Sequence, residues 1–100
     1  MQIVKNELNK DTAIVKPVGR LDISSAADFK KEVIEFVENY QNLILNFSEV
    51  SFISSIGLSS LLELSRIMND KKGSMKLINV TFDVMYIFNM TGFDKILNIE

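Results

Sequence analysis

The order of strand-like and helix-like patterns along the chain constrains its fold more than any other feature. Residues 2–8 and 12–18 are short β-rich runs joined by a polar turn, which predicts an antiparallel hairpin. Pro17 lacks an N–H group, so we expect its stretch at a strand end or on a sheet edge. Residues 43–47 and 75–80 predict two further strands, the first in the middle of the sheet and covered on both faces. Helical periodicity separates these strands, and this alternation predicts a mixed α/β sheet with a parallel crossover.

The first helix is predicted to begin after Ser25, where apolar side chains recur every three or four residues as far as Tyr40. Ser25 followed by Asp28 resembles a capping box, in which the hydroxyl meets a free amide and the carboxylate suits the positive helix end. The spacing therefore predicts an amphipathic surface helix with a capped start.

A second helix is predicted from Ile56 or Gly57 to Asp70 or Lys71, with Gly73 as its left-handed cap. Its apolar side chains cover an arc of roughly 220°, which is wider than packing against one sheet requires. Either neighbouring elements cover the edges of this arc or part of it meets a partner, and burial is the more common outcome.

Residues 82–90 predict a short third helix that follows Thr81 as a cap and stops at Gly92, although their aromatic content would also suit a strand. As a helix, the segment has almost no polar face. Some of its side chains must then be exposed unless the tail covers them, and we expect a contact surface near Met85 and Tyr86. That surface would serve a partner or a second copy of the chain, so a weak homodimer is one expectation.

The chain contains neither cysteine nor histidine, which removes structural zinc sites, thiol chemistry and every Ser-His pair. No run of carboxylates has the spacing of a calcium loop, so we expect no metal, no cofactor and no enzymatic activity. The 11 Lys and Arg against 13 Asp and Glu give a net charge of −2, which argues against nucleic acid as a partner.

The length of 100 residues and the hydrophobic content of 47% fit one core, so residues 1–100 are predicted to form a single domain. The N-terminus alternates apolar and polar residues, unlike a signal peptide. Nothing approaches the roughly 18 consecutive apolar residues of a spanning helix. We therefore expect a cytoplasmic protein without membrane contact.

Residues 54–60, SSIGLSS, gather hydroxyl groups at the predicted start of the second helix. Free amides and the helix dipole favour negative charge there, so a phosphate could be accommodated without unfolding the domain and could block a partner. A serine before a helix is more often only an N-cap, and that interpretation stays open. A catalytic serine is disfavoured because the segment lacks a G-x-S-x-G elbow and the chain has no histidine base.

Motifs along nearly the whole chain occur in the order of one known family. Residues 19–22, GRLD, match its G-x-L-D element, and residues 45–53, LNFSEVSFI, match its central strand and following turn. Residues 54–58 match its D-S-S-G-L regulatory motif, and residues 77–80 with 90–93 match its last strand and the end of its third helix. The chain thus resembles the STAS domains of anti-sigma factor antagonists. The resemblance implies a STAS fold, a mixed sheet of four to five strands with three to four helices mainly on one side.

The resemblance also implies a function. Such antagonists bind an anti-sigma factor that is itself a serine kinase, and so release a sigma factor. The kinase phosphorylates a serine of the regulatory motif, and a metal-dependent serine phosphatase removes the phosphate. An alternative function is a constitutive STAS scaffold or complex subunit without phospho-switching.

Ile56 stands at the common acceptor position and cannot be phosphorylated, so Ser55 is the acceptor candidate and Ser54 the alternative. Asp22 could take part in partner contact or could only close the turn before Ser25. The resemblance places the partner-binding surface at six residues: Asp22, Ser54, Ser55, Ile56, Gly57 and Ser59.

Overall fold

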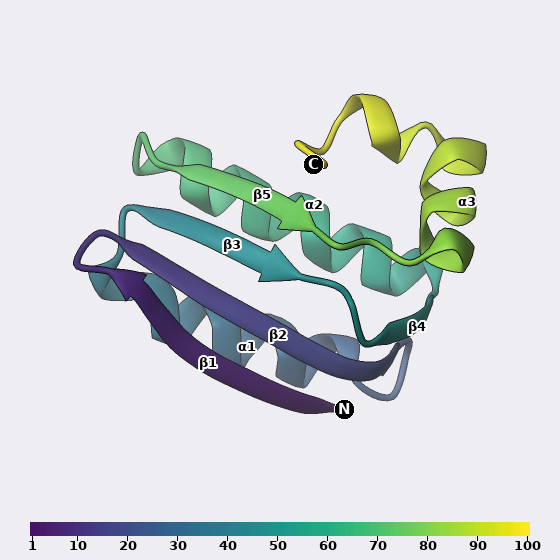
Figure 1. Cartoon of the computed structure of the whole chain (residues 1–100), viewed down its shortest axis with the longest axis horizontal. Helices are drawn as coiled ribbons and strands as arrows, with labels where there is room; N and C mark the ends of the chain where they lie inside the picture. Colours follow the sequence, from purple (N-terminus) through teal and green to yellow (C-terminus); the bar gives the residue numbers. More distant parts are fainter.

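The computed structural model describes residues 1–100 and contains one five-stranded mixed sheet with three α-helices. The strands are β1 (Gln2–Asn9), β2 (Thr12–Leu21), β3 (Asn42–Asn46), β4 (Val50–Ile53) and β5 (Ser74–Ile78). The helices are α1 (Ala26–Phe36), α2 (Ser55–Asp70) and α3 (Phe82–Thr91), with short 3₁₀ turns at Val37–Asn39 and Phe93–Lys95. The sheet order is β1-β2-β3-β5, and β4 pairs with β2. Figure 1 shows α1 and α2 behind the sheet, on one side as the resemblance implied, and α3 at one end.

The opening hairpin forms as predicted, but β2 is longer and more central than expected. It pairs antiparallel with β1 and parallel with two strands, with β3 over residues 12–15 and with β4 over residues 19–21. Placing Pro17 at a strand end or sheet edge was therefore wrong. Pro17 lies between the two parallel stretches, where neither β3 nor β4 pairs with β2, so a missing N–H breaks no parallel bond there.

Helix α1 begins where predicted, but the capping box does not form. The Ser25 hydroxyl caps no helix amide. It accepts a hydrogen bond from the Asp22 amide at 3.1 Å and donates one to the Arg20 carbonyl at 2.7 Å. The hydroxyl is thus committed to closing the loop between β2 and α1, which takes precedence over the local capping pattern.

Helix α2 ends as predicted, but the left-handed residue is not the glycine. Lys72 has φ 62°, whereas Gly73 has no positive φ. A Cβ at Gly73 would lie 1.7 Å from the Gln41 carbonyl oxygen, so this glycine is required for close approach of two chain segments. The prediction that Gly73 supplies the left-handed cap was therefore wrong.

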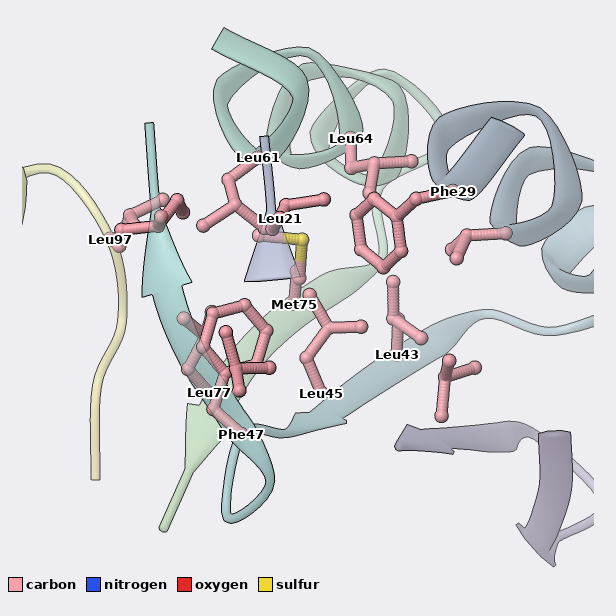
Figure 2. Close-up of a cluster of buried hydrophobic side chains, with 14 of the residues drawn as sticks. Leu21, Phe29, Leu43, Leu45, Phe47, Leu61, Leu64, Met75, Leu77 and Leu97 are labelled. Atoms are coloured by element: carbon pink, nitrogen blue, oxygen red, sulfur yellow. The ribbon is translucent and has the colours of Figure 1, made fainter. Parts of the chain in front are cut away.

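The core lies between the sheet and the pair α1 and α2. Figure 2 shows Leu61 and Leu64 of α2 facing Leu43 and Leu45 of β3. Burial alternates along β3, because Leu43 and Leu45 are buried while Ile44 is only half-buried. The prediction that both faces of β3 are covered was wrong, since α1 and α2 cover only one face of the sheet (Figure 1).

Segment 82–90 is helical, as predicted, and α3 is anchored by two buried side chains. Val84 and Phe88 are fully buried, and the Phe88 ring centroid lies 6.4 Å from that of Phe47. Met85 is half-buried, so its side chain is less exposed than a contact surface at Met85 and Tyr86 would require. The exposed apolar side chains of α3 follow one another at four-residue steps: Phe82, Tyr86 and Met90.

Candidate functional site

The N-terminus of α2 follows β4 directly, and Ser54 is its N-cap. Ser54 has extended backbone angles, and its side chain accepts a hydrogen bond from the Gly57 amide at 3.4 Å. Its carbonyl accepts the Leu58 amide at 2.9 Å. The N-cap interpretation is therefore right for Ser54, whose hydroxyl is engaged in starting the helix.

The neighbouring hydroxyl groups divide into exposed and buried ones. Ser55 is the first residue of α2 and is exposed, and its hydroxyl forms no hydrogen bond within the chain. Ser59 is also exposed and lies one helical turn further along the same face. Ser60 is buried and donates to the Ile56 carbonyl at 3.0 Å. Ser55 and Ser59 are thus the exposed hydroxyl-bearing residues of this segment, while Ser54 is half-buried.

Gly57 joins the start of α2 to the end of β2. A Cβ at Gly57 would lie 2.6 Å from the Leu21 carbonyl oxygen and 2.8 Å from Ile53 Cγ1. The Ser54 amide donates to the same Leu21 carbonyl at 3.0 Å. Gly57 itself is buried, so it shapes the surface by packing and offers a partner no side chain.

Asp22 follows Leu21 and therefore lies beside the α2 N-terminus. Its carboxylate accepts hydrogen bonds from the Ser24 hydroxyl at 2.7 Å and the Ser24 amide at 3.0 Å. These two bonds, with a smaller contribution from Arg20, hold the pKa of Asp22 below its usual value. Asp22 thus closes the loop, as its structural interpretation predicted, and its ionised form is favoured.

Sequence reasoning missed three residues around this site. The Arg20 guanidinium lies 4.3 Å from the Phe52 ring centroid and 3.4 Å from Asp22. Ile23 is 83% exposed in the loop between β2 and α1. An isoleucine between an aspartate and two serines is an apolar residue in a polar loop, and that signal could have identified it.

Two exposed isoleucines adjoin the polar residues of the site. Ile23 follows Asp22, and Ile56, 44% exposed, follows Ser55. Apolar side chains among polar and charged ones are the composition of a protein-binding surface. The site is therefore suited to contact with another protein, and its free hydroxyl is suited to accept a modification.

No three or more His, Cys, Asp or Glu side chains are grouped to hold a metal ion. None of the helices combines the length and the apolar composition that crossing a lipid bilayer requires.

The one-sided α/β sheet and the serine-bearing start of α2 define a small α/β domain in which a helix N-terminus adjoins the loop after β2. The STAS domain family model matches residues 4–100, and the chain belongs to this family. The predicted family and fold are thereby confirmed.

Known relatives share this architecture. The chain is 25% identical over 92 residues to the anti-sigma-B factor antagonist of Bacillus subtilis (strain 168), covering 92% of this chain and 84% of that protein. It is 26% identical over 98 residues to the anti-sigma F factor antagonist of Paenibacillus polymyxa, a match that covers 96% of this chain and 84% of that protein. The unphosphorylated anti-sigma factor antagonist SpoIIAA superposes with a TM-score of 0.83 at 19% identity, covering 99% and 88%. Phosphorylated SpoIIAA of Bacillus superposes with a TM-score of 0.75 at 19% identity, and the match covers 99% of this chain and 91% of that one.

Proposed function

We propose that this chain is an anti-sigma factor antagonist whose binding to an anti-sigma factor is controlled by phosphorylation of Ser55. The observation that carries the proposal is that two adjacent serines differ in exposure and hydrogen bonding. Ser55 is exposed with a free hydroxyl, whereas the Ser54 hydroxyl accepts the Gly57 amide. The names of the two curated relatives support the class of partner.

In the unphosphorylated state, the partner covers the α2 N-terminus and the loop between β2 and α1. Ile23 and Ile56 supply apolar contact area, and Asp22, Ser55 and Ser59 supply polar groups around it. Binding the anti-sigma factor through this surface frees the sigma factor.

The anti-sigma factor is also the kinase that switches the antagonist off. It transfers the γ-phosphoryl group of ATP to Ser55 Oγ, the hydroxyl loses its proton, and ADP leaves. The new charge of about −1.5 to −2 is accommodated by the free amides of the helix start, so the fold is kept. At the interface the same charge must be desolvated, which weakens the complex.

A metal-dependent serine phosphatase restores the active form. Water attacks the phosphorus, inorganic phosphate leaves, and the Ser55 hydroxyl is regenerated. The antagonist is a substrate in both steps and not an enzyme. These partners act on transcription, so we place the protein in the cytoplasm.

One observation favours a second function, that of a constitutive scaffold or complex subunit. Ile56 occupies the position where related domains commonly carry the acceptor, and its exposed side chain gives the surface an apolar contact that no phosphate controls. In this case the surface binds a partner whatever the state of Ser55.

Phosphosite mapping tests the switch. The chain is incubated with ATP and the serine kinase anti-sigma factor of the same organism, and its phosphopeptides are sequenced by mass spectrometry. We expect one phosphate on Ser55 in the parent, Ser54→Ala and Ser59→Ala proteins, and none in Ser55→Ala. A phosphate on Ser54 would show that Ser54, not Ser55, is the acceptor. A chain that stays unmodified would contradict regulation by phosphorylation.

A binding measurement separates the switch from the scaffold. Ser55→Asp places a charge at the α2 start, and Asn69→Asp places the same charge on an exposed position near the other end of α2. The switch requires that Ser55→Asp weakens kinase binding at least tenfold while Asn69→Asp leaves it unchanged. Equal affinity of both variants and the parent protein would identify a scaffold.

A further inference from the structure

The uncovered face of the sheet carries a cavity of about 280 Å³ at the end opposite to the α2 N-terminus. Strands β2, β3 and β5 are parallel, and the cavity lies at their N-terminal ends, whereas the α2 N-terminus adjoins the C-terminal end of β2. Neither the fold nor the proposed function uses this hollow. Seven residues line it: Leu8, Thr12, Asn42, Leu43, Ile44, Ser74 and Lys76.

The strand register explains how the cavity is built. Thr12, Asn42 and Ser74 are direct partners across β2, β3 and β5, and form one row. The next row on the same face is Ile14, Ile44 and Lys76, two residues further along each strand. The cavity therefore has a polar row at one side and an aliphatic and a cationic group at the other.

Leu8 closes the cavity from β1. The register between β1 and β2 shifts between Glu7 and Asn9, so Leu8 has no partner in β2. A β-bulge of this kind re-aims a side chain, and Leu8 lines the hollow while remaining 58% exposed. The bulge thus places the apolar Leu8 side chain at the edge of the cavity.

The polar row keeps hydrogen-bonding capacity in reserve. The Ser74 hydroxyl donates to Asn42 Oδ1 at 2.8 Å, which orients the Asn42 amide nitrogen as a free donor. Thr12 is only 9% exposed, and its hydroxyl forms no hydrogen bond within the chain. No fully buried side-chain polar atom lacks a partner, so the Thr12 hydroxyl retains contact with the cavity.

Lys76 is the one charged residue that lines the cavity, and its charge is cationic. Its ammonium group is held by a carboxylate of the chain itself, Glu100 Oε2 at 2.9 Å. Glu100 is bound beside β5 through its amide, which donates to the Leu77 carbonyl at 2.9 Å. The Lys76 ammonium is therefore paired with an exposed carboxylate of the tail, which a ligand has to displace.

We propose that this cavity binds a small aliphatic carboxylate. The ligand's carboxylate replaces Glu100 at Lys76 and accepts from the Asn42 amide, and its short alkyl chain lies against Leu8 and Ile44. The volume is just under the roughly 300–1,000 Å³ of pockets for drug-sized ligands, so the ligand is small. A ligand so small binds with a dissociation constant on the order of millimolar.

An NMR titration of the ¹⁵N-labelled full chain with sodium hexanoate tests the proposal. We expect saturable shifts at Thr12, Asn42 and Ser74, and unchanged signals at Ser54 and Ser55. Hexanol, which has the alkyl chain without the charge, and sodium chloride at equal ionic strength should produce no saturable shift. Absence of saturation with hexanoate, or equal binding of hexanol, would overturn the proposal.

Three variants identify the groups involved. Glu100→Gln removes the internal competitor and should tighten hexanoate binding by up to about fivefold, the value of an exposed ion pair. Leu8→Ser should weaken binding at least threefold, whereas Ile96→Ser, at a similarly exposed position, should leave it unchanged. Both serine variants keep the core intact, so a dispersed spectrum with unaltered affinity in Leu8→Ser would refute the assigned site.

Discussion

The main chain at Gly57 passes so close to Leu21 that a Cβ atom there would lie 2.6 Å from the Leu21 carbonyl oxygen. This contact, together with the Ser54 amide that donates to the same carbonyl, fixes the start of α2 against the end of β2. Gly57→Ala forces one of the two segments to move, so we expect a loss of about 1–3 kcal/mol in unfolding free energy. Urea unfolding measures it. Ser59→Ala, on the exposed face of the same helix, is the control and should stay within about 0.5 kcal/mol of the parent.

The two serines at the start of α2 should differ in their effect on stability. Ser54→Ala removes the side chain that accepts the Gly57 amide, and we expect a loss of about 1 kcal/mol. Ser55→Ala removes a hydroxyl without a partner, and its unfolding free energy should remain within about 0.5 kcal/mol of the parent. Equal losses measured by urea unfolding would contradict the assignment of Ser54 as the cap.

The hydrogen bonds to Asp22 make part of the stability depend on pH. The pKa of Asp22 is lower in the folded protein than the usual 3.8, so its ionised form is favoured by folding. The stabilisation is fully present above pH 3.8 and is lost as the pH falls through the lower folded value. The difference in unfolding free energy between the parent and Asp22→Asn should therefore shrink toward acid pH. A ¹³C titration of the Asp22 carboxyl group that gives an ordinary or raised pKa would contradict this.

Local patterns were enough to predict most of the elements. The first helix was predicted from residue periodicity, which reports directly on which side chains face the core. The hairpin was predicted from two β-rich runs and a polar turn, the strand at residues 43–47 from a short apolar run, and the third helix from Thr81 and Gly92 as its ends. The N-cap at Ser54 has the same local origin, because the cap hydrogen bond spans only three residues.

The features that local patterns missed depend on contacts between distant residues. The Ser25 hydroxyl was expected to cap α1, but the Arg20 carbonyl engages it, and no pattern within α1 reports that. The central position of Pro17 depends on the pairing of β4 with β2, which are about thirty residues apart in the sequence. Such a non-local pairing leaves no pattern in a short stretch of sequence. The stacking of Arg20 on Phe52 follows from the same pairing, so this part of the site could not be read from spacing.

Lys71 ties the ends of two helices together. Its ammonium group donates to the Val37 carbonyl at 2.7 Å and the Tyr40 carbonyl at 2.8 Å, so a cation meets the carbonyl-rich end of the first helical segment. Lys71→Met removes both bonds and should cost about 1.5–3 kcal/mol in urea unfolding. Lys72→Met is the matched control, because Lys72 is exposed and should cost under about 0.5 kcal/mol. Equal unfolding free energies of the two variants would show that water satisfies the two carbonyl groups when the Lys71 ammonium is removed.

The exposed side chains of α3 lead to our prediction on self-association. Phe82, Tyr86 and Met90 are 85%, 58% and 70% exposed, and we propose that a second copy covers them in a weak homodimer. In sedimentation equilibrium, the mean mass of the parent protein should rise with concentration. Met90→Lys, which places a charge in the contact, should stay monomeric, whereas Asn69→Lys on α2 should behave as the parent does. A parent protein that remains monomeric at millimolar concentration would exclude the dimer, and a dimer that survives Met90→Lys would place its interface elsewhere.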